Sequence, residues 1–121
     1  ADFISVNLPL LPGTRGCINA VLIRHMKSSA ILVNMARGPI WNEADVLEAL
    51  RTGRIAAAGA DVFEEEPTPA QNPLFTVDNF VGTPHMAAHT NEGMGRMSLV
   101  ARDVLAVLEG RSPEFPVPGT C

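Results

Sequence analysis

Several features that define large protein classes are scarce in this chain. It has only two cysteines, Cys17 and Cys121, so we expect two free thiols in a reducing cytoplasm rather than a disulfide framework. No run approaches the roughly 18 apolar residues of a membrane span, and the first residues lack the basic start of a signal peptide. The net charge of −4, without a basic stripe, argues against nucleic-acid binding. A globular, cytoplasmic protein without membrane or nucleic-acid partners is therefore predicted.

Two kinds of ligand site are also missing from the sequence. The segment 12–16 has two glycines, but it lacks the Lys-Ser/Thr of a phosphate loop and the glycine spacing of a dinucleotide loop. His85 and His89 are four residues apart, yet a zinc-protease helix requires glutamate where Met86 stands. No third ligand is apparent, so we predict no metal site.

The rest of the chain reads as apolar strand segments that alternate with helical segments. We predict strands over 2–8, 30–35, 55–62 and 79–82, and helices over 19–26, from the N-cap Asn42 to the stop at Gly53, and over 89–109. Gly110 would end the last helix, and the proline-rich segment 113–119 would be extended. Strands that alternate with helices indicate an α/β fold with a parallel sheet.

Polar residues stand where these strands end, at the edge where such sheets bind ligands. Arg37 follows the second strand, and its planar fork suits a carboxylate. His85 follows Thr83-Pro84 and could exchange a proton, above all beside a carboxylate that stabilises its protonated form. From residue types alone, however, Arg37 could be a surface arginine and His85 an ordinary exposed histidine.

The run Glu64-Glu65-Glu66 before Pro67 offers three carboxylates for that histidine. Glu66 is the first candidate because it lies between the acidic run and the proline. Residue types do not separate it from Glu64 and Glu65, and the whole run could be a solvated acidic loop.

In these segments the sequence resembles the D-2-hydroxyacid dehydrogenases, which include D-lactate, glycerate, glyoxylate and phosphoglycerate dehydrogenases. The resemblance extends over nearly the whole chain in the same order. Its residues are 2–10 with Thr14 and Gly16, 30–38, 59–67 and 83–85.

The resemblance implies catalytic roles. Arg37 would bind the carboxylate and carbonyl of the substrate, a small 2-hydroxy or 2-oxo acid. His85 would be the acid/base, and Glu66, directly before the proline, would pair with it. The cofactor would be NAD or NADP, because hydride transfer requires a nicotinamide held close to the carbonyl.

The resemblance also implies residues that bind the cofactor. Asp61 would contact the nicotinamide carboxamide. The segments around Leu8, around Met35 and Ala36, and from His85 to Ala88 would line the nicotinamide side.

The fold implied is a Rossmann-like parallel sheet with helices on both faces, here the second half of a dinucleotide-binding domain. Residues 1–109 would form that half, including a long return helix, and residues 110–121 would lead back toward a substrate domain. The glycine-rich half would precede Ala1, so the isolated chain would be inactive. The intact protein would be a homodimer. The alternative is a corepressor-like scaffold that senses the cofactor.

Overall fold

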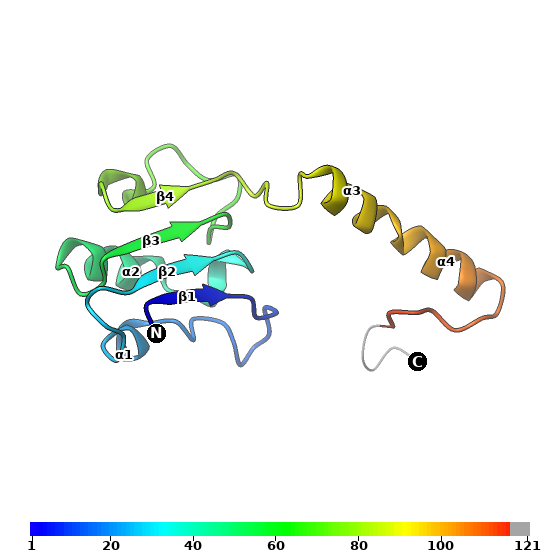
Figure 1. Cartoon of the computed structure of the whole chain (residues 1–121), viewed down its shortest axis with the longest axis horizontal. Helices are drawn as coiled ribbons and strands as arrows, with labels where there is room; N and C mark the ends of the chain where they lie inside the picture. Colours follow the sequence, from blue (N-terminus) through cyan, green and yellow to red (C-terminus); the bar gives the residue numbers. More distant parts are fainter. Residues whose placement is uncertain (117–121) are drawn as a thin grey trace. The chain divides into compact units, whose positions relative to one another are not determined.

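A computed structural model of the protein describes residues 1–116, and the chain divides into two compact units, Ala1–Met86 and Ala87–Cys121 (Figure 1). The predicted thiol of Cys121 and the last part of the predicted extended tail lie outside the described residues. In chain order the elements are β1 (Phe3–Val6), α1 (Ala20–Ile23), β2 (Ile31–Asn34), η1 (Gly38–Ile40), α2 (Glu43–Arg51), β3 (Ala57–Ala60), η2 (Pro73–Thr76), β4 (Phe80–Gly82), α3 (Asn91–Ser98) and α4 (Val100–Leu108).

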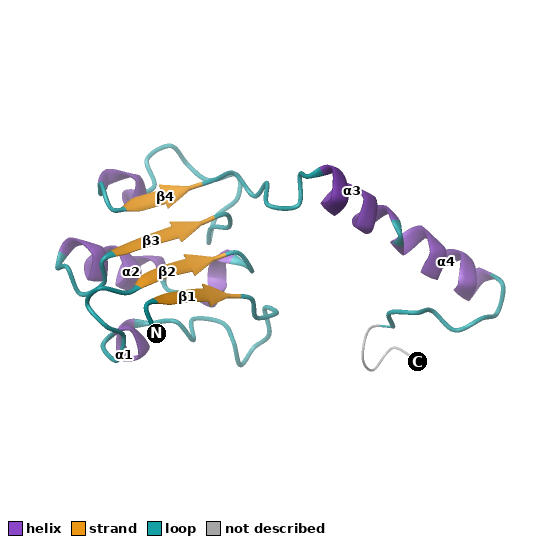
Figure 2. Cartoon of the chain, viewed as in Figure 1, coloured by secondary structure: helices purple, strands orange, loops and turns teal. Residues whose placement is uncertain are grey.

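The four strands of the first unit form one parallel sheet in the order β1-β2-β3-β4 (Figure 2). Val6 lies opposite Asn34, Asn34 opposite Ala60, and Ala60 opposite Gly82, so all four strands end at the same edge. Connections through α1, α2 and η2 return the chain to the start of each next strand, as parallel pairing requires. The predicted α/β class with a Rossmann-like parallel sheet is confirmed.

The strands are shorter than the apolar segments that predicted them. Ile55 and Val62 are fully buried, yet both lie outside β3. Apolar composition reports burial, whereas a strand is defined by its hydrogen-bonded ladder, and the chain stays buried for a residue or two after it leaves the sheet.

The core lies on one face of this sheet. Leu32 and Ala58 point into it, and they pack with Ile23 of α1 and with Val46 of α2. On the opposite face Phe3 is 75% exposed, so the helices of this unit cover the core face. This alternation of side chains is the period of two expected of a strand.

Helix α2 has the ends that its sequence predicts. The Asn42 side chain accepts a hydrogen bond from the Asp45 N–H at 3.0 Å, which satisfies a donor that the first turn leaves free. Gly53 follows the helix in the left-handed conformation, with φ +67°. The predicted N-cap and stop are confirmed.

The single helix predicted over 89–109 is wrong in one respect, because Leu99 separates α3 from α4. The Ser98 hydroxyl donates to the Gly95 carbonyl at 2.7 Å, and the Leu99 N–H bonds instead to Arg96 O at 3.1 Å. A serine that takes the carbonyl of the preceding turn competes with the helical ladder, and the ladder tightens locally. Among residues 1–116 no helix is long and apolar enough to cross a membrane.

Candidate active site

The loops that follow β2, β3 and β4 carry the predicted catalytic side chains to one edge of the sheet. Arg37 comes three residues after the end of β2, Glu66 six residues after β3, and His85 three residues after β4. Because the parallel strands end in register, these loops are neighbours although they are far apart in sequence.

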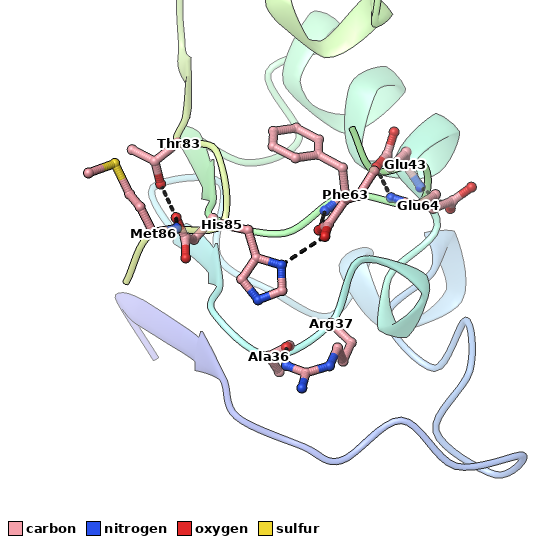
Figure 3. Close-up of polar contacts among 10 residues, drawn as sticks. Ala36, Arg37, Glu43, Phe63, Glu64, Thr83, His85 and Met86 are labelled. Atoms are coloured by element: carbon pink, nitrogen blue, oxygen red, sulfur yellow. Dashed lines mark hydrogen bonds and ion pairs between the residues drawn. The ribbon is translucent and has the colours of Figure 1, made fainter. Parts of the chain in front are cut away.

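His85 and Glu66 form an ion pair at this edge. Nδ1 of His85 lies 2.7 Å from Oε2 of Glu66, with 48% and 37% of the two side chains exposed (Figure 3). His85 has φ +52°, a left-handed conformation that is uncommon for a residue with a side chain. Strained residues of this kind concentrate at functional sites, where the surrounding structure holds them.

The environment of Glu66 favours its ionised form. The hydrogen bond from His85 is the largest cause that holds the pKa of Glu66 below its ordinary value, although partial burial opposes it. The Phe63 N–H donates to Oε1 at 2.9 Å and lowers the pKa further. The positive charges of His85 and Arg37 add to the effect. Glu66 is therefore a carboxylate held ready for a protonated histidine.

Arg37 is exposed, and Nη1 of its guanidinium donates to the Ala36 carbonyl at 2.6 Å (Figure 3). Its other nitrogens remain available for a carboxylate. The guanidinium lowers the pKa of Glu66, so the two charges interact across the edge. Arg37 and His85 nevertheless line two different hollows, and the structure shows no direct contact between them.

Asp61 is 2% exposed and lies at the base of the loop that carries His85. Its Oδ1 accepts hydrogen bonds from the Thr83 hydroxyl at 2.5 Å and from the Met86 N–H at 2.9 Å. The acceptor thus joins the residues on both sides of the left-handed His85. Residue types alone did not predict this contact, although Asp61 is a predicted site residue.

A second set of contacts was missed by sequence reasoning. The side chains of Glu43 and Glu64 accept hydrogen bonds from each other's backbone N–H groups (Figure 3). The Asn72 side chain also donates to Glu43. Glu43 is not among the predicted site residues, and Glu64 was considered only as an alternative to Glu66 beside His85. No spacing rule links these residues, because the fold alone brings them together.

Comparison with known proteins decides the family. Residues 1–87 match the family described as D-isomer specific 2-hydroxyacid dehydrogenase, NAD binding domain. The chain belongs to this family. Its resemblance to the 2-hydroxyacid dehydrogenases is thereby confirmed.

Individual members of the 2-hydroxyacid dehydrogenase family are also similar. A D-3-phosphoglycerate dehydrogenase from Methanocaldococcus jannaschii is 48% identical over 115 residues, which are 94% of this chain and 22% of that protein. The crystal structure of a D-lactate dehydrogenase with NAD+ from Lactobacillus jensenii superposes with a TM-score of 0.83 and 35% identity, over 97% of this chain and 39% of that one.

The structure of an NADPH-dependent glyoxylate/hydroxypyruvate reductase from Sinorhizobium meliloti, in complex with NADP and sulfate, gives a TM-score of 0.84 and 32% identity. The match covers 97% of this chain and 38% of that one. The chain therefore spans between about a fifth and two fifths of the length of these three dehydrogenases.

The carboxyl edge also carries the residues that are predicted to line the nicotinamide side of the cofactor. Leu8 and Met35 are 45% and 41% exposed, although both are large and apolar. A hollow of about 570 Å³ is lined by Asn7, Leu8, Pro9, Leu10, Met35, Ala36 and Arg37. The hollow therefore combines exposed apolar side chains with the polar groups of Asn7 and Arg37.

Ala88 is exposed and belongs to the second unit, so its predicted contact with the cofactor stays a prediction. Among residues 1–116 no group of three or more His, Cys, Asp or Glu side chains could hold a metal ion.

Proposed function

We propose that the protein containing this chain is an NAD(P)-dependent dehydrogenase that interconverts a small 2-oxo acid and the corresponding D-2-hydroxy acid. The observation that carries the proposal is the 2.7 Å pair of His85 and Glu66 at the carboxyl edge of a sheet of this family. The charge of Arg37 reaches the same edge. Such a pair beside an arginine suits a reaction that moves a proton on and off an oxygen next to a carboxylate.

A bound nicotinamide would supply or accept the hydride. The residues of this chain move the proton and bind the substrate. Because Nδ1 of His85 is held by Glu66, its Nε2 can give a proton to the carbonyl oxygen in reduction and take it back in oxidation. The negative charge of Glu66 stabilises the protonated ring. The free nitrogens of Arg37 bind the substrate carboxylate and stabilise the charge that develops on the oxygen.

We further propose that Leu8, Met35 and Ala36 form the wall behind the nicotinamide. Asp61 contributes from the segment that follows β3. The contact of Ala88, which belongs to the second unit, stays a prediction from the resemblance. Exposed apolar side chains at the end of two adjacent strands support this assignment, because a bound ring would remove them from water.

The test is turnover by the intact protein, with NADH and NADPH, on a panel of 2-oxo acids. His85→Asn should lower kcat by about 10²–10⁴, the usual contribution of a general acid/base. His25→Asn, at another exposed histidine, is the matched control and should leave kcat unchanged.

Cofactor binding without turnover of any 2-oxo acid would contradict the proposal and favour the alternative, a corepressor-like scaffold that senses the cofactor. Full activity of both Arg37→Ala and His85→Asn would also contradict it.

The same proposal includes a homodimer in the cytoplasm. It also assigns residues 1–109 to half of an NAD(P)-binding domain and residues 110–121 to a return toward a substrate domain. Sedimentation of the intact protein tests the dimer, and cell fractionation tests the location.

A further inference from the structure

The loop that carries Glu66 is attached to the start of helix α2 by a reciprocal pair of hydrogen bonds. The Glu64 N–H donates to Oε1 of Glu43 at 2.7 Å, and the Glu43 N–H donates to Oε1 of Glu64 at 3.0 Å (Figure 3). The buried Asn72 donates from Nδ2 to Oε2 of Glu43 at 2.9 Å. The loop is thus held at Glu64, the fourth residue after β3, by the first residue of a helix that begins 21 positions earlier in the chain.

Two neighbouring carboxylates would repel each other at most surface positions. Here both lie at the N-terminus of a nine-residue helix, where unpaired N–H groups and the helix dipole favour negative charge. The same loop contains Glu65, which is exposed and makes no side-chain hydrogen bond within residues 1–116. The three glutamates therefore differ in their contacts although they are adjacent in sequence.

The loop also packs closely against the backbone at Gly38. A Cβ on Gly38 would lie 1.9 Å from the carbonyl carbon and oxygen of Phe63 and 2.4 Å from the Glu64 nitrogen. The loop after β3 therefore rests directly on the residue that follows Arg37. Contacts on both sides leave it little freedom, and Glu66 lies two residues further on.

From these contacts we infer that Glu43 and Glu64 are positioning residues, which hold the loop so that the Glu66 carboxylate meets Nδ1 of His85. They touch neither His85 nor a substrate, and they act through Glu66. The inference rests on the proposed function for its catalytic consequence only. Its structural content, the fixed distance between Glu66 and His85, does not depend on any activity.

The first test measures the Glu66 carboxylate itself, by a carbon-13 NMR titration of the intact protein. Loss of a neighbouring negative charge alone would lower the pKa of Glu66. Loss of the hydrogen bonds between Glu43 and Glu64 would free the loop and raise this pKa, because the hydrogen bonds from His85 and Phe63 that lower it would weaken. The two effects have opposite signs, so the direction of the shift decides between them.

Glu64→Ala should therefore raise the pKa of Glu66. The matched control Glu65→Ala removes the same charge from the same loop and should lower it or leave it unchanged. Glu64→Gln removes the charge but keeps an oxygen acceptor for the Glu43 N–H, so it should behave like Glu65→Ala and not raise the pKa of Glu66. Glu64→Asp keeps the charge but withdraws the carboxylate by one methylene, so it serves if the alanine variant does not fold.

The second test is the reaction. Displacement of a catalytic group by about 1 Å can cost about a hundredfold, so Glu64→Ala should lower kcat by tenfold or more, with little change in KM. Arg37, which the proposal assigns to the substrate carboxylate, keeps its own contacts in this variant, so the loss should appear in kcat rather than in KM.

The outcomes separate the inference from the proposed function. A pKa of Glu66 that moves alike in Glu64→Ala and Glu65→Ala would overturn the inference. If the pKa of Glu66 shifts as expected in each variant but the parent protein turns over no 2-oxo acid, the proposed function is overturned. The role of Glu43 and Glu64 in positioning the loop would then still stand.

Discussion

Replacement of Gly38 by alanine tests how closely the loops of the site are packed. The new Cβ would lie 1.9 Å from Phe63 C and O, whereas ordinary contact begins near 3.4 Å, so the loop must retreat by about 1.5 Å. Backbone atoms block the position, and no side-chain rotation relieves the overlap. Overpacking of this kind costs about 1–3 kcal/mol. For a unit of this size each kcal/mol lowers Tm by about 4–8 °C.

A retreat of that size would also separate Glu66 from His85, which are now 2.7 Å apart. We therefore expect Gly38→Ala to lower both Tm, measured by scanning calorimetry, and kcat for 2-oxo acid reduction. Gly13→Ala is the control, because a Cβ at Gly13 would meet nothing within 4 Å. The packing argument is refuted if Gly38→Ala and Gly13→Ala have the same Tm and the same kcat.

Three further predictions follow from single contacts. Glu66→Gln should reduce the free energy of unfolding at neutral pH. Because the pKa of Glu66 is lowered in the folded protein, the stability that its carboxylate contributes is lost as pH falls through that lowered pKa. Chemical denaturation should therefore give the two proteins the same free energy of unfolding in acid. A constant difference at every pH would contradict this. Asn42→Ala should cost about 1 kcal/mol in the same assay through loss of the α2 N-cap, whereas Asn42→Ser should retain most of it. Ser98→Ala frees the Gly95 carbonyl and should slow hydrogen exchange at Leu99, and unchanged exchange would assign the helix break to another cause.

Local features of the fold were accessible from the sequence because each is decided within a few residues. The side chain of Asn42 reaches the first turn of its own helix, and Gly53 ends that helix by its own backbone conformation. The break at Leu99 is also local, but it depends on the hydrogen bond from the Ser98 hydroxyl to the Gly95 carbonyl. The spacing of apolar residues does not predict which acceptor a serine hydroxyl binds.

The candidate site was accessible only in part. Arg37 and His85 could be placed at strand ends, because a parallel sheet brings those ends to one edge. Their placement in separate hollows could not be predicted, since it depends on the conformations of three loops. The contact of Asp61 with the loop on both sides of His85 depends on the same loops.

The sequence by itself determined the order of strands and helices, the parallel sheet, the ends of α2 and the family, because these follow from local patterns and motifs. The roles of the three adjacent glutamates were decided by tertiary structure. Glu64 bonds to the start of α2, Glu65 stays in solvent, and Glu66 meets His85. Identical side chains in a row have the same local chemistry, so only the packing of distant segments around the loop distinguishes them.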